Sequence, residues 1–217
     1  MVVLIPLVIV AGLLATMLAW RAIGRGRPVW QTLPPVLGIF GVASLLLGRT
    51  IDPPAAGGAE VPGVAGQIAV GLVSGALFFA ATRVFVALAA RVPVFRRHVV
   101  AAYEEAGAAS DWREVVLSLA LAVPGEELFW RGLTYRWGAS QVSSLGVAAL
   151  LVWVGYIVAN VPSRSLAIVA GAIVGGALWG WLAWWSGGVA APLGSHLVWT
   201  GAMIAFPPRV AAVERAR

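Results

Sequence analysis

The chain has 217 residues, of which 60% are hydrophobic and only 11% are charged, and its mean hydropathy is +0.90. No ordinary soluble domain has this composition, so the sequence predicts an all-α, polytopic membrane protein. The formal net charge is +6, but the arginines lie between apolar segments, where they suit lipid headgroups and orientation signals and not nucleic acid. The lack of cysteine excludes disulfides, thiol nucleophiles and thiolate metal sites.

Seven apolar segments predict about seven transmembrane helices, because each approaches the ~20 residues that a bilayer requires. In chain order they are residues 1–20, 35–48, 64–90, 113–137, 142–160, 166–185 and 189–206. The first has no basic residue before it and is followed by Arg21, Arg25 and Arg27. This pattern indicates a spanning helix that starts outside, not a cleaved signal peptide, and puts the basic tail, 207–217, inside. An alanine- and glycine-rich chain whose basic residues are all arginine is typical of a GC-rich bacterial genome, so we expect a bacterial plasma membrane.

Two segments between the spans and one charged residue within a span are also informative. Residues 49–63 are rich in proline and glycine and predict a turn-rich loop, and residues 99–113 predict an interfacial helix. Within that helix we interpret the carboxylate pair Glu104 and Glu105 as a solvated surface feature. Arg83, inside the third span, must reach the interface or find a partner.

The sixth span repeats small residues, a spacing that lets helix backbones approach closely within one chain or between two copies. Its glycines are Gly171, Gly175, Gly176 and Gly180, and its tryptophans, for which we predict an interfacial belt, are Trp179, Trp181, Trp184 and Trp185. We divide the whole chain into three parts. Residues 1–110 are expected to contain the N-terminal transmembrane helices and an interfacial segment. They are followed by a functional core in residues 111–206 and then by the basic tail.

Two adjacent carboxylates and an arginine interrupt the fourth span at Glu126, Glu127 and Arg131. A charge in hydrocarbon costs at least about 2.5 to 3.5 kcal/mol, so an intramembrane acid is a functional-site hypothesis. Glu127 and Arg131 are four residues apart and share a helix face, so we expect an ion pair that fixes helix packing. Glu126 points about 100° away from Glu127 and is the acid left free for chemistry.

Few polar residues in the later spans can serve Glu126. His196 is the histidine within an apolar segment, Thr200 lies one turn later on the same face, and Asn160 ends the fifth span. A water between Glu126 and His196 could lose a proton to the carboxylate while His196 and Asn160 donate hydrogen bonds to an oxyanion, a set that hydrolyses an amide bond. The alternatives are a core histidine, a helix-terminal asparagine cap and a threonine bonded to its own turn.

The seven-span topology leaves one conflict in the depth of these residues. Glu126 and His196 both fall about ten residues, or roughly 15 Å, from the outer surface, whereas Asn160 falls near the inner surface. Three explanations remain open: a segment is shorter or more tilted than drawn, the fourth span runs the other way, or Asn160 lies outside the site.

The pattern Glu126-Glu127-x-x-x-Arg131, followed on later spans by an aromatic-x-x-x-polar and a His-x-x-x-polar motif, resembles the CPBP intramembrane endopeptidases. These include the CAAX prenyl proteases and the bacteriocin-processing and immunity proteins. The resemblance covers about residues 111–206. It implies that Glu126 activates a water molecule and that Glu127 and Arg131 support the same motif.

The two later motifs depart from the family pattern. The second corresponds to Tyr156 through Asn160, with asparagine in place of the usual histidine, and the third to His196 through Thr200, with threonine in place of asparagine or aspartate. Asparagine can donate a hydrogen bond but cannot be protonated, and threonine holds a water less firmly. Loss of one oxyanion donor typically slows turnover about 100- to 1,000-fold.

Three functions are compatible with these departures. The first choice is a divergent intramembrane endopeptidase that acts on a membrane-associated peptide or protein. The second is a catalytically impaired relative that serves as a membrane peptide-binding scaffold or chaperone. The third is a proton or ion relay in which Glu126 carries the proton.

The sequence offers little for a metal or cofactor. It contains only two histidines, His98 in a basic loop and His196, and it has no His-Glu-x-x-His motif. Glu126, His196 and Asn160 would be a poor zinc ligand set. We therefore expect no metal and no cofactor, and we expect the partners to be the lipid bilayer and a peptide or protein substrate.

Overall fold

The computed structural model describes residues 3–107 and 112–208, which form helices and connecting loops with no strand among them. The predicted all-α class is confirmed for these residues, and most of the predicted basic tail, 207–217, lies outside them. The helices are α1 (Leu4–Ile23), α2 (Val29–Gly48), α3 (Val64–Ala89), α4 (Pro93–Gly107), α5 (Trp112–Glu127), the π-helix η1 (Leu128–Thr134), α6 (Tyr135–Gln141), α7 (Leu145–Asn160), the 3₁₀ turn η2 (Val161–Ser163), α8 (Leu166–Ser186) and α9 (Ala190–Ala205).

Five of the described helical segments are long and apolar enough to cross a membrane, namely α1, α2, α3, α7 with η2, and α8. They correspond to five of the seven predicted spans. The fourth predicted span is the continuous segment α5–η1–α6, in which the motif acids and the change of helix type interrupt the apolar run. The last predicted span is α9, which has only 16 residues.

Two predicted helix boundaries were wrong. The second span begins at Val29, because Pro34 and Pro35 lie inside α2 and do not mark its start. Proline is tolerated in a membrane helix where neighbouring groups satisfy the freed carbonyls. The interfacial helix predicted for residues 99–113 is α4, which begins at Pro93. Glu104 on α4 is exposed, which agrees with a solvated role, whereas the side chain of its predicted partner Glu105 lies outside the described part of the chain.

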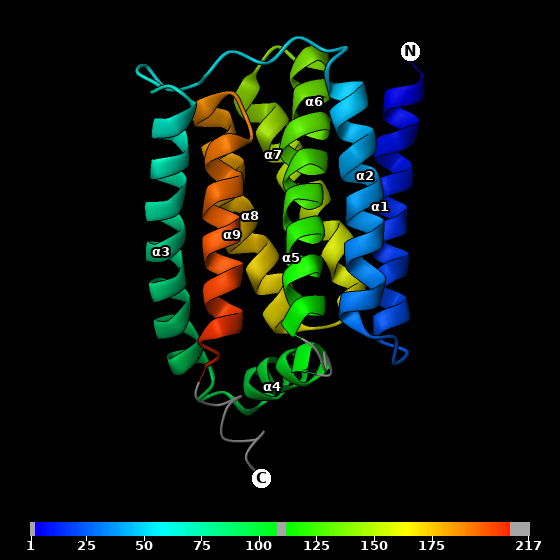
Figure 1. Ribbon diagram of the computed structural model, residues 1–217, viewed down its shortest axis with the longest axis vertical. Helices are drawn as coiled ribbons and strands as arrows, with labels where there is room; N and C mark the ends of the chain where they lie inside the picture. The colour runs from blue at the N-terminus through cyan, green and yellow to red at the C-terminus, as the bar shows by residue number, and fades with distance from the viewer. Residues whose placement is uncertain (1–2, 108–111, 209–217) are drawn as a thin grey trace.

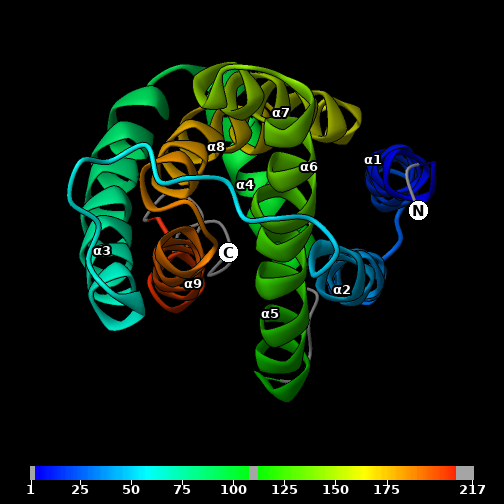
Figure 2. The same cartoon turned by 90° about the horizontal axis from the view of Figure 1, so that it is seen from above.

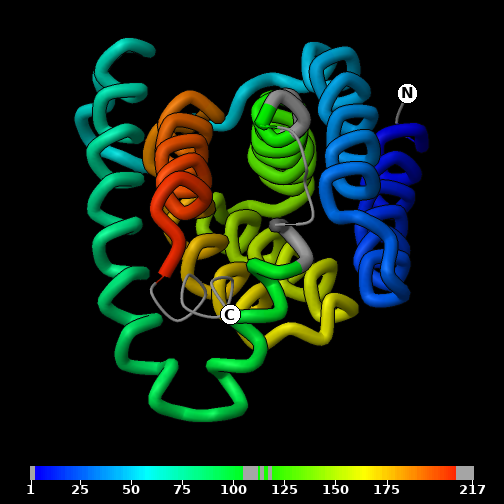
Figure 3. Tube along the Cα trace, turned by 60° about the horizontal axis from the view of Figure 1, so that its bottom comes forward, coloured from blue at the N-terminus to red at the C-terminus, as the bar shows by residue number. Residues whose placement is uncertain are grey.

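The helices form a bundle in which α5 lies between α2 and α9 (Figures 1 and 2). α1 and α2 pack together on one side, α3 packs against α9 on the other, and α7 packs against α8. α4 lies across one end of the bundle (Figures 1 and 3). The last turn of α1, which carries Arg21, reaches this same end, as do the α1–α2 connection with Arg25 and Arg27 and the α3–α4 connection with Arg91 (Figure 1).

Glycines let the backbones of the bundle approach closely at two crossings. Where α2 meets α5, a Cβ atom on Gly125 would lie 2.3 Å from the carbonyl oxygen of Leu37. Where α3 meets α9, a Cβ atom on Gly75 would lie 2.4 Å from the carbonyl oxygen of Ser195. Gly125 directly precedes Glu126 in the sequence, and Ser195 directly precedes His196. Close packing at these two crossings therefore positions both side chains.

We expect Gly75→Ala to lower the free energy of unfolding by about 1 to 3 kcal/mol, because the new methyl group meets backbone that cannot move aside. Gly180→Ala on α8 is the control, since a Cβ atom there meets nothing within 4 Å. SDS titration of both variants in mixed micelles measures the difference. Equal stability of the two variants would contradict the tight α3–α9 crossing.

The glycines predicted to pack α8 divide into two groups. Cβ atoms on Gly175 and Gly176 would press on aromatic rings at 2.9 Å and 2.7 Å, whereas those on Gly171 and Gly180 would meet nothing within 4 Å. Of these four glycines, only the two in the middle of α8 are therefore tightly packed.

Arg83 lies in the apolar helix α3 and has hydrogen-bond partners, as predicted. Its guanidinium donates to the carbonyl oxygens of Phe206 and, at 2.6 Å, Pro207, which follow the end of α9. Carbonyls at a helix C-terminus carry partial negative charge and lack helical partners. Arg83 therefore caps α9 and joins it to α3.

Candidate active site

The motif acids lie where α5 changes into a π-helix. α5 ends at Glu127, and η1 begins at the next residue. Pro124, which has no backbone N–H to donate, lies just before the change. Side chains of η1, including Phe129 and Trp130, are almost fully buried in the aromatic core of the bundle. Single turns of π-helix inside α-helices are frequent at functional sites.

The predicted ion pair between Glu127 and Arg131 is confirmed. Arg131 Nη1 lies 3.0 Å from Glu127 Oε1, and the two residues are 3% and 0% exposed. The Arg131 guanidinium also lies over the ring of Tyr156, 4.6 Å from its centroid. These contacts with a carboxylate and with an aromatic face offset much of the hydration free energy that the buried arginine loses.

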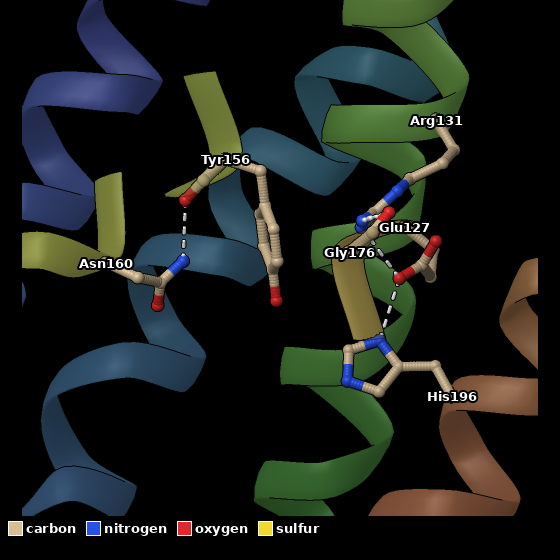
Figure 4. Close-up of polar contacts among 6 residues, drawn as sticks. All are labelled: Glu127, Arg131, Tyr156, Asn160, Gly176 and His196. Atoms are coloured by element: carbon tan, nitrogen blue, oxygen red, sulfur yellow. Dashed lines mark hydrogen bonds and ion pairs between the residues drawn. The ribbon is translucent and has the colours of Figure 1, made fainter. Parts of the chain in front are cut away.

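Glu127 has a second partner, His196 of α9. Nδ1 of His196 lies 2.7 Å from the same Oε1 atom that binds Arg131 (Figure 4). An ionised carboxylate only accepts hydrogen bonds, so Nδ1 carries a hydrogen and donates it. The sequence-based prediction placed His196 beside Glu126. In the structure its direct hydrogen bond goes to Glu127, and Nε2 is the ring nitrogen left for other chemistry.

Trp179 fixes the plane of the histidine ring. Its indole stacks on His196 with ring centroids 3.7 Å apart and an interplanar angle of 19°. Trp179 is only 1% exposed, so its predicted place in an interfacial belt was wrong. The reason is that α8 turns this tryptophan toward α9, where its area is buried against the histidine.

Asn160 is held by two hydrogen bonds at the end of α7. Its Nδ2 donates to the carbonyl oxygen of Tyr156 at 2.9 Å (Figure 4), and its Oδ1 accepts from Nε1 of Trp20, also at 2.9 Å. The first bond joins neighbouring turns of one helix, whereas the second joins α7 to α1. Asn160 is 6% exposed and therefore depends on both partners.

A cavity of about 520 Å³ brings the predicted polar residues together. Glu126, Asn160, His196 and Thr200 line it, and so does Tyr156. The rest of the wall is largely apolar and comes from α1 to α4 and from α7 to α9. Glu127 and Arg131 lie behind this wall. The arrangement offers one partly exposed carboxylate, one imidazole and one amide to a molecule in the cavity.

The cavity also brings together residues for which the seven-span topology predicted different depths. It extends from His196 to α4, whose side chains Phe95, Val99 and Tyr103 line it at the end of the bundle. In the view from above, α1, α2 and α9 are seen nearly end-on, whereas α5 runs obliquely (Figure 2). A long cavity between tilted helices lets Asn160, near the end of α7, share one space with Glu126.

Sequence reasoning missed three contributors to the site. Trp20 and Trp179 have no local pattern that marks them, because their contacts to Asn160 and His196 join helices far apart in the chain. Tyr156 was named as the aromatic residue of the second motif, but its contact with Arg131 was not predicted.

No group of three or more histidine, aspartate or glutamate residues suited to a metal ion occurs in the part of the chain that the structure describes. The donor set at the cavity is one imidazole, one amide and one free carboxylate, with Glu127 already held by two partners. Zinc sites usually take their ligands from several histidines, thiolates or carboxylates.

Residues 108–202 match the Rce1-like family of type II CAAX prenyl endopeptidases. The resemblance to CAAX-type proteases is thus confirmed over this segment, which includes all six predicted site residues. No curated protein and no solved structure matches the chain. The Rce1-like segment supports a membrane protease, and α1 to α4 lie outside it, as do the residues after 202.

Proposed function

We propose that this protein is an intramembrane glutamic endopeptidase that hydrolyses a peptide bond in a membrane-associated peptide or protein. The observation that carries the proposal is the difference between the two motif acids. Glu127 is fully buried and bound by Arg131 and His196, whereas Glu126 is partly exposed in a cavity that His196 and Asn160 also line. The match to an endopeptidase family gives the class of reaction.

In the proposed reaction Glu126 acts as a general base on a water molecule. The water oxygen attacks the scissile carbonyl carbon, and its proton passes to the Glu126 carboxylate. Nε2 of His196 and Nδ2 of Asn160 stabilise the resulting oxyanion by hydrogen bonds. The C–N bond then breaks as Glu126 returns the proton to the leaving nitrogen, so the carboxylate is regenerated and one water is consumed.

The proposed role of Glu127 and Arg131 is to hold His196. Glu127 fixes the hydrogen on Nδ1 and turns Nε2 toward the reaction, as an acid partner does in hydrolases that use a histidine. Donation from both Nδ1 and Nε2 requires the form of the ring in which each nitrogen carries a hydrogen.

Thr200 has a hydroxyl that suits a role in the same step. It lines the cavity, and its oxygen finds no hydrogen-bond partner within the described residues, so the alternative of a bond to its own turn is not observed. We expect Thr200→Val to lower kcat by about 10- to 100-fold with unchanged or slightly higher stability, because valine removes a buried unpaired hydroxyl of similar size. A valine variant with full activity would exclude Thr200 from the reaction.

We further propose that α5–η1–α6 and α9 share the bilayer with the five apolar spans, which makes seven crossings with the N-terminus outside. The arginine-rich connections and α4 then lie on the cytoplasmic side of a bacterial plasma membrane. Residues 111–206 form the peptidase core in this proposal, and residues 1–110 complete the cavity wall.

The experiment uses the purified full-length protein in liposomes. Internally quenched reporter peptides that end in a prenylated CAAX sequence, and the same peptides without the prenyl group, are incubated with it and the products identified by mass spectrometry. Peptides from cell membranes with and without active protein are compared in parallel. Cleavage at a defined bond supports the proposal. No product from either reporter and identical membrane peptides would overturn it in favour of a scaffold.

A further inference from the structure

Trp20 connects the first helix of the protein to the proposed active site. It lies near the end of α1, outside the segment that matches the endopeptidase family. Its Nε1 donates a hydrogen bond of 2.9 Å to Oδ1 of Asn160, a residue 140 positions later in the chain. Both side chains line the same cavity. The contact therefore reaches the site from a part of the sequence that carries none of the family motifs.

The chemistry of the two partners of Asn160 fixes the orientation of its amide. An indole nitrogen only donates and a backbone carbonyl only accepts, so Oδ1 must face Trp20 and Nδ2 must face the carbonyl of Tyr156. A flipped amide would put two donors together at the indole and two acceptors together at the carbonyl. One hydrogen of Nδ2 is used by Tyr156, and the second remains as a donor of defined direction.

Resting on the proposed peptidase function, we propose that Trp20 is a positioning residue that aims the free N–H of Asn160 at the oxyanion. Trp20 touches no reacting atom in this role and acts only through Asn160. Its own position is set by the buried face of α1, where Thr16, Ala19 and Ile23 are each about 95% buried in the bundle. α1, which packs against α7 and η2, is thereby part of the catalytic apparatus.

The hydrogen bond from the Trp20 indole compensates for the rotational freedom of the Asn160 amide. A free asparagine amide can rotate about its terminal bond, and either of its ends can face a ligand. The Trp20 bond removes this freedom. An amide held in one orientation costs less reorganisation when the oxyanion forms.

The test is Trp20→Phe, which keeps an aromatic ring and removes the donor. In the reporter-peptide assay we expect kcat to fall roughly two- to tenfold with KM almost unchanged, the range expected for loss of one neutral hydrogen bond. The matched control is Trp153→Phe on α7. Its indole donates to the Ile173 carbonyl oxygen at the same distance of 2.9 Å and lies outside the cavity wall, so kcat should not change.

A double-mutant cycle separates positioning from general loss of packing. If Trp20 acts through Asn160, then Trp20→Phe should lower kcat in the native background and have no further effect in Asn160→Ala. An equal loss in both backgrounds, an unchanged kcat in Trp20→Phe, or an equal loss in Trp153→Phe would each overturn the proposal.

Fluorine NMR tests the contact without any need for catalysis. In protein labelled with 5-fluorotryptophan, the resonance that disappears in Trp20→Phe should shift in Asn160→Ala and stay in place in Trp153→Phe. If wild-type protein cleaves no peptide, the proposed function fails while this shift still establishes that Trp20 holds Asn160. A Trp20 resonance that does not move in Asn160→Ala overturns the positioning role whatever the activity.

Discussion

Replacing Glu126 with glutamine should lower kcat for the reporter peptide by about 100- to 10,000-fold, the usual contribution of a general base. Glutamine has nearly the same shape, but its amide cannot take a proton from water. Because Glu126 is partly exposed in the cavity and is outside the Glu127 ion pair, the fold should be unaffected. Initial rates in liposomes and thermal unfolding of the same samples measure the two effects.

The control for this variant is Glu104→Gln. Glu104 is also a glutamate, but it is exposed on α4, so its loss should leave both rate and stability unchanged. Two results would count against the assignment of Glu126. One is residual activity above about a tenth of wild type, which is more than loss of a general base permits. The other is a loss of thermal stability in Glu126→Gln large enough to account for the lost activity, which would give Glu126 a structural role.

Replacing Arg131 with methionine should have the largest effect on stability. Removal of one partner of a buried ion pair typically costs about 3 to 5 kcal/mol, because the remaining charge is left without compensation. Arg131 is 3% exposed, and its loss would leave Glu127 with His196 as its remaining partner in the described structure. Methionine keeps much of the side-chain volume. SDS titration in mixed micelles measures the change in the free energy of unfolding.

Two further variants show how the effect of Arg131→Met on stability should be interpreted. Arg97→Met removes an arginine exposed on α4 and should change stability by less than about 0.5 kcal/mol. The double variant Glu127→Gln with Arg131→Met should be more stable than Arg131→Met alone, because it leaves no unpaired carboxylate. If the double variant is the less stable one, the burial cost of the Glu127 charge is not what Arg131 compensates.

The double variant also separates stability from catalysis. It should remain poorly active even where its stability recovers, because the neutral glutamine amide forms a weaker hydrogen bond to Nδ1 than the Glu127 carboxylate does and holds His196 less firmly. Recovery of both properties would mean that His196 needs no acid partner.

The sequence by itself determined the membrane class, the all-helical fold and the Glu127–Arg131 pair. These follow from local physics: apolar runs are stable only in lipid or in a core, and residues four apart on a helix meet whatever surrounds them. The same local reasoning identified Glu126, Asn160, His196 and Thr200 as polar exceptions in apolar segments. The structure places all four on one cavity.

Only the tertiary structure decided which partner each of these residues has. Helix periodicity fixes the face of a residue on its own helix, but not the rotation and height of one helix against another. Those depend on close crossings such as Gly75 against Ser195, which brings His196 to Glu127 and not to Glu126. The same long-range packing sets Trp179 on His196 and Trp20 on Asn160, since these contacts exist only after distant helices have met.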